Sequence, residues 1–133
     1  MMSDTLVETI SLRNKLKLEI WDVSRILAGD RWLLRLEARI SVPLKTEFFD
    51  AIPEKEKFFP VLEKVFGSEI PYCHVEEKHF VDPNEKEESF QQCLGYLKNN
   101  LLPYLNHPDF LRRFVLSRYR ALREKNPELF ESD

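Results

Sequence analysis

The strongest constraint on this fold is an alternation of apolar and polar side chains over residues 15–42. The even-numbered positions are apolar in two runs, which a Gly29-Asp30 segment separates. The apolar positions are Leu16, Leu18 and Ile20 in the first run and Trp32, Leu34, Leu36, Ala38, Ile40 and Val42 in the second. Strand side chains point alternately to the two faces of a sheet, so a period of two is typical of a half-buried strand. The pattern therefore predicts two strands joined as a hairpin.

Charges on the other face of this hairpin indicate how its strands pair. Residues directly opposite one another share a face, and like charges there are unfavourable. If paired residue numbers sum to 58, Glu19 lies opposite Arg39, whereas a sum of 56 places Glu19 opposite Glu37. We expect the first register, with Gly29 in the turn, where its access to positive φ is useful. Asp22 then falls on the apolar face, so we expect the ladder to end or bulge near it.

The segment that follows the hairpin is rich in phenylalanine and proline. Pro53 and Pro60 cannot both lie in one undisturbed helix, because proline breaks a helix interior. Each proline suits a first helical position, which predicts two or three short helices that end at Gly67.

A third strand and two further helices are expected in the rest of the chain. Residues 72–81 are bounded by prolines and are interpreted as the strand. Asp82 and Glu85 have the spacing of a capping box, which predicts a helix that starts there. Apolar residues recur at helical spacing over residues 90–105, and a last helix is expected from Pro108.

Together these elements predict an α+β fold that forms a single domain over residues 1–133. We expect a small three-stranded antiparallel sheet, made of the hairpin and the third strand. Helices should cover one face of this sheet, giving a two-layer sandwich. If one helical layer separates the second and third strands, the third strand pairs with the first, and the order is second, first, third.

The composition indicates a globular protein in water. The chain is 43% hydrophobic, and its apolar runs are too short to cross a bilayer. Its first ten residues carry Asp4 and Glu8, where a secretory signal would carry positive charge. We therefore expect a soluble, cytoplasmic protein with no membrane partner. Cys73 and Cys93 fit no metal-ligand spacing and are expected to be free thiols.

The only sequence cluster of metal-capable or acid/base residues runs from Cys73 to His79. On a strand, Cys73, Glu77 and His79 project to one side, and His74 and Glu76 to the other. The first three span about 20 Å, too far to share one ion. We expect no metal and no cofactor, and whether these residues form any site stays open. The alternative is a small-molecule or metal-dependent enzyme that uses the strand from Cys73 to His79. Glu77 and His79 could act in it as an acid/base pair under a helical layer, and His74 and Glu76 could share a metal ion if a residue from another element joined them.

Catalytic motifs are missing elsewhere in the sequence. There is no nucleophile elbow, HExxH pair or paired-carboxylate signature. With three glycines in the whole chain, a glycine-rich phosphate loop is excluded. No catalytic residue is assigned, and the sequence favours a protein without catalysis of its own.

The C-terminal helix is basic although the whole chain has a net charge of −3. Clustered arginines bind phosphates, so this helix offers candidates for an anion or nucleic-acid site. The pI of about 5.7 and the absence of a recognition motif argue against nucleic acid. Basic residues near a helix C-terminus also stabilise the helix dipole, which is the simpler explanation. The candidates are Arg112, Arg113, Arg120 and Arg123.

The odd-numbered face of the hairpin carries the leading functional hypothesis. If helices cover the even face, this face has no cover, yet it presents Trp21 and Leu33 beside Arg35 and Arg39. Aromatic and arginine side chains are enriched at interface hot spots. We therefore expect a non-catalytic binding protein, a homodimer or the partner of another protein, that uses these four residues. The alternative is that the N-terminal segment folds back over this face.

Overall fold

The computed structural model describes residues 4–45 and 55–125, which form an α+β fold. They fall into two compact units. Of the described residues, the first unit contains 4–41 and 71–106, and the second contains 42–45, 55–70 and 107–125. The predicted fold class is confirmed. The prediction for Pro53 lies outside the described residues.

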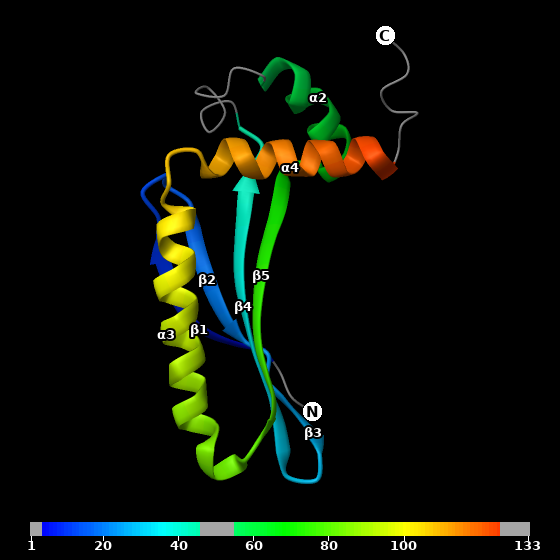
Figure 1. Ribbon diagram of the computed structural model, residues 1–133. Coiled ribbons are helices and arrows are strands. Elements are labelled where there is room, and N and C mark those ends of the chain that lie inside the picture. The colour runs from blue at the N-terminus through cyan, green and yellow to red at the C-terminus, as the bar shows by residue number, and fades with distance from the viewer. Residues whose placement is uncertain (1–3, 46–54, 126–133) are drawn as a thin grey trace. The chain divides into compact units, whose positions relative to one another are not determined.

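The sheet contains five strands among the described residues (Figure 1). They are β1 (Thr5–Ser11), β2 (Lys17–Asp22), β3 (Arg25–Ala28), β4 (Arg31–Pro43) and β5 (Glu69–Val81). β2 and β3 pair one after the other along the same strand, β4, and β1 pairs with β2. β5 pairs with β4 and runs in the opposite direction to it (Figure 1).

The predicted hairpin register is confirmed. Glu19 lies opposite Arg39, and the pairing sum of 58 holds throughout the β2–β4 ladder. Gly29 sits in the turn with φ of +59°. The ladder breaks after Asp22, whose Oδ1 accepts a hydrogen bond of 2.9 Å from the backbone N–H of Ser24. A polar side chain on the apolar face thus turns the backbone and ends β2.

The predicted strand number and strand order are wrong. The third predicted strand, β5, pairs with the second, β4, and not with the first. β1, a strand that was not predicted from the sequence, instead pairs with the edge of β2 that was expected to bind β5. A short turn joins β1 to β2, where the N–H of Leu12 donates to the carbonyl of Leu16 over 2.8 Å and Lys15 has φ of +69°. This local hairpin leaves β4 as the available partner for β5.

One helix, α3 (Lys86–Leu105), covers the even-numbered face of the sheet (Figure 1). It follows a single 3-10 turn, η1 (Pro83–Glu85), at which Asp82 Oδ1 accepts a hydrogen bond of 2.8 Å from the N–H of Asn84. The predicted helix start is therefore confirmed. The core between helix and sheet includes Leu18, Ile20 and Leu36 from the strands and Leu97, Leu101 and Leu105 from the helix.

The second unit contains α2 (Lys55–Phe66) and α4 (Phe110–Lys125), which pack against each other. Gly67, with φ of +80°, donates its N–H to the carbonyl of Glu63 and ends α2 as predicted. Pro60 lies inside α2 and does not start a new helix, so that prediction is wrong. The last helix begins at Phe110, which is buried and stacks on Phe114, and not at Pro108.

Candidate functional site

The sheet face opposite α3, which we call the open face, carries an exposed apolar pair. Leu6 of β1 lies directly opposite Trp21 of β2. Leu6 is 45% exposed, and Trp21 is half-buried. The indole Nε1 of Trp21 donates to Glu19 Oε1 over 3.2 Å, and the guanidinium of Arg39 lies over the ring. No other described element of the first unit lies over this face, because α3 occupies the opposite one (Figure 1).

A network of ion pairs surrounds this apolar pair. Glu37 lies at its centre, accepting from Arg35 Nε over 3.1 Å and from Arg39 Nε over 2.9 Å. Arg35 Nη1 also contacts Glu77 Oε2 at 2.7 Å, and Arg39 Nη2 contacts Asp4 Oδ2 at 3.2 Å. The network therefore crosses the sheet from the start of β1 to β5.

The network shifts the pKa values of Arg35, Glu37 and Arg39 toward their charged forms. Burial acts to raise the pKa of Glu37, but hydrogen bonds from Arg39 and Arg35 outweigh it and lower that pKa. Hydrogen bonds to Glu77 and Glu37 raise the pKa of Arg35. A partner that covers the open face at neutral pH would therefore meet charges that are already paired.

The four predicted partner-binding residues differ in their exposure to solvent. Trp21, Arg35 and Arg39 each keep part of their side chain exposed. Leu33 is only 4% exposed and belongs to the core of its own chain. The alternative in which the N-terminal segment covers this face is wrong for residues 5–11, which extend the sheet at its edge. The face also includes Leu6, which sequence reasoning missed.

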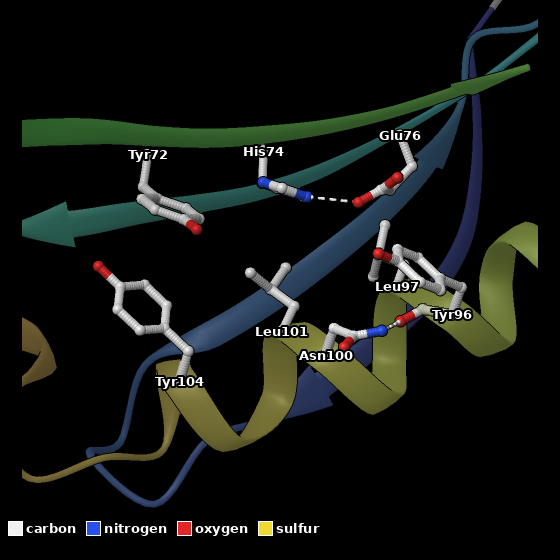
Figure 2. Close-up of a pocket in the computed structure, with 8 residues that line it drawn as sticks. All are labelled: Tyr72, His74, Glu76, Tyr96, Leu97, Asn100, Leu101 and Tyr104. Atoms are coloured by element: carbon white, nitrogen blue, oxygen red, sulfur yellow. Dashed lines mark hydrogen bonds and ion pairs between the residues drawn. The ribbon is translucent and has the colours of Figure 1, made fainter.

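The strand from Cys73 to His79 divides its side chains between two surfaces. Cys73 and Glu77 lie toward the open face, where Glu77 binds Arg35 and burial raises the pKa of the Cys73 thiol. His74 and Glu76 point toward α3 (Figure 2). Glu77 and His79 are exposed, so the acid/base pair predicted under a helical layer is not formed.

A groove opens between β5 and α3 where His74 and Glu76 lie (Figure 2). Its volume is about 340 Å³, and His74 Nε2 lies 2.8 Å from Glu76 Oε1. Burial, followed by the neighbouring Tyr104, raises the pKa of Tyr72 to about 12. The residues that line the groove are Tyr72, His74, Glu76, Tyr96, Leu97, Asn100, Leu101 and Tyr104. The described residues contain no group of three or more His, Cys, Asp or Glu placed to hold a metal ion.

The candidate anion-binding arginines lie along α4 but do not converge on one point. Arg113 and Arg120 line a hollow of about 400 Å³ on the helix surface, and Glu124 lines it too. Arg112 and Arg123 are not among the residues that line it. The acidic side chain in this hollow, and a lining that includes two of the four arginines, give no support for a phosphate site built from all four.

Comparison with protein-family models, curated proteins and solved structures finds no match to this chain. Among the described residues, no helix is long and apolar enough to cross a membrane. The described residues form an α+β fold with an open sheet face and a groove between β5 and α3.

Proposed function

We propose that this protein is a non-catalytic binding protein that forms a homodimer through the open face of its sheet. The observation that carries the proposal is the juxtaposition of Leu6 and Trp21, side by side on a face that no described element of their unit covers. Trp and Arg are the residues most often found at interface hot spots. Trp21 and Arg39 are in contact here, with a distance of 4.9 Å from guanidinium to ring centre.

The charges on this face favour a second copy of the chain as the partner. A two-fold axis brings the same surface patch of each subunit together, so the patch must complement itself. The open face alternates arginines with carboxylates, which allows Arg35 and Arg39 of one copy to lie near Glu37 or Glu77 of the other. Burial of charges is costly when they are unpaired, and these are paired before association.

Native mass spectrometry of the untagged protein tests this proposal. We expect a dimer for the wild type and a monomer for Leu6→Glu and for Trp21→Glu, each with an unchanged far-UV circular dichroism spectrum. Ile26→Glu is the matched control, because Ile26 is an equally exposed aliphatic residue, at 50%, on β3. Its pairing with Trp32 places it on the other face, so it should remain a dimer. A monomeric wild type would overturn the proposal, as would a dimer that survives both substitutions.

A further inference from the structure

The groove between β5 and α3 is elongated. One wall runs along β5 from Tyr72 to Glu76, about 13 Å for four residues of strand. The other runs along α3 from Tyr96 to Tyr104, about 12 Å for eight residues of helix. Leu97 and Leu101 lie between the two ends (Figure 2). A linear molecule suits this shape better than a round one, and the volume of about 340 Å³ lies within the range of small-molecule sites.

The groove contains a carboxylate. Of the eight residues that line it, Glu76 is the one with an acidic side chain, and neither Lys nor Arg is among them. The Glu76 side chain is 27% exposed, so its carboxylate is partly withdrawn from water but still reachable. His74 binds Oε1 and so fixes the orientation of the carboxylate, whereas Oε2 has no hydrogen-bond partner among the described residues. Lys78, the next cation along the strand on this side, contacts Ser89 Oγ at 3.5 Å and does not line the groove.

The aromatic side chains of the groove, like its carboxylate, favour a cationic ligand. The faces of aromatic rings attract cations, and cages of aromatic side chains bind ammonium groups. Tyr96 is 59% exposed and Tyr104 42% exposed, so ring surface at both ends is accessible to a ligand. The leucines between them offer apolar contact to a hydrocarbon chain.

We propose that this groove binds a linear organic cation, an alkylammonium compound. Its ammonium group lies against Glu76 and Tyr96, and its hydrocarbon chain runs over Leu97 and Leu101 toward Tyr72 and Tyr104. A carboxylate ligand is disfavoured because Glu76 repels it. A neutral alcohol of the same length makes the apolar contacts without the ionic one.

Three probes of equal chain length distinguish the ionic contribution to binding from the apolar one: hexylammonium, hexanol and hexanoate. Each is titrated into isotopically labelled full-length protein while backbone amide shifts are followed by nuclear magnetic resonance. Hexylammonium should bind in the millimolar range and shift the amides of Tyr96, Asn100 and Glu76. Hexanol should bind more weakly, and hexanoate should not bind.

The matched pair of variants is Glu76→Gln and Glu77→Gln. These adjacent residues face opposite sides of β5, so the same substitution removes a charge from the groove in one variant and from the open face in the other. We expect Glu76→Gln to weaken hexylammonium binding about tenfold, the effect of one lost charge-assisted contact, and Glu77→Gln to leave binding unchanged. Equal affinity for hexanol and hexylammonium, saturable binding of hexanoate, or equal effects of the two substitutions would overturn the proposal.

The groove lies on the face of the sheet opposite the proposed dimer surface, so the two proposals can fail separately. The Trp21→Glu variant should bind hexylammonium as the wild type does, whatever its oligomeric state. Loss of binding in a folded Trp21→Glu monomer would contradict the assignment of the ligand to the groove.

Discussion

The guanidinium of Arg39 lies 4.9 Å from the ring centre of Trp21, and the same side chain binds both Glu37 and Asp4. Arg39 therefore joins β2, β4 and the residue that precedes β1 on the open face. Its own pKa reflects these contacts: burial acts to lower it, but the hydrogen bonds to Glu37 and Asp4 raise it.

Replacement of Arg39 by Met should lower the free energy of unfolding by about 1 kcal/mol, since one cation–π contact and two partly exposed ion pairs are lost. Urea denaturation of the wild type and of Arg39→Met measures this difference. Arg25→Met is the control, because Arg25 is exposed on β3 and is not part of the network. Equal destabilisation by both substitutions would show that the network contributes nothing specific.

The phenol of Tyr72 should titrate late at alkaline pH, because its pKa is raised from 10.0 to about 12 in the folded protein. The folded state keeps this proton where the unfolded state has already lost it. Tyr72 therefore adds stability below pH 10, and this contribution is lost as the pH rises from 10 to about 12. A tyrosinate absorbance titration should show a late component that is missing in Tyr72→Phe. An unchanged titration curve in that variant would contradict the burial of Tyr72 against Tyr104.

Asp82 should hold the start of η1 and α3 in place. The hydrogen bond from the Asn84 N–H, followed by the contact with Arg31 Nη1 at 2.7 Å, lowers the pKa of Asp82. Asp82→Ala should speed hydrogen exchange at the Asn84 amide while the centre of α3 stays protected. Asp30→Ala is the control, because Asp30 also contacts Arg31, at 3.7 Å, but caps no helix. Equal exchange rates at Asn84 in the two variants would argue against the cap.

The sequence predicted the structure best where strand pairing depends on residues that are close together in the chain. The alternation in β2 and β4 and the opposite charges of Glu19 and Arg39 were sufficient to predict their register, and Gly29 marked the turn. β1 was missed because its register shifts between Leu6 and Glu8, which interrupts the alternation that identifies a strand. The order of the strands depends on which strand edges remain free for pairing. Because β1 was not predicted, the edge of β2 was wrongly expected to pair with β5.

The groove was less predictable than the hairpin. Sequence reasoning singled out the strand that contains His74 and Glu76 but favoured Glu77 and His79 as the acid/base pair. The other wall comes from α3, a helix distant in sequence, and only packing brings it to β5. One signal was present: Tyr96, Asn100 and Tyr104 recur every four residues beside the apolar stripe of the helix, which places them along one flank of its buried face.

Glu76 and Glu77 are neighbours in the chain, but their side chains lie on opposite faces of β5. Because strand side chains alternate, a single-residue insertion or deletion before them would move each glutamate to the other face of the strand. An insertion would bring Glu76 to the position that contacts Arg35 and carry Glu77 past the groove, whereas a deletion would bring Glu77 into the groove and remove the contact with Arg35. A length change in β5 should therefore alter both surfaces at once, whereas a substitution at either glutamate should change one surface and preserve the other.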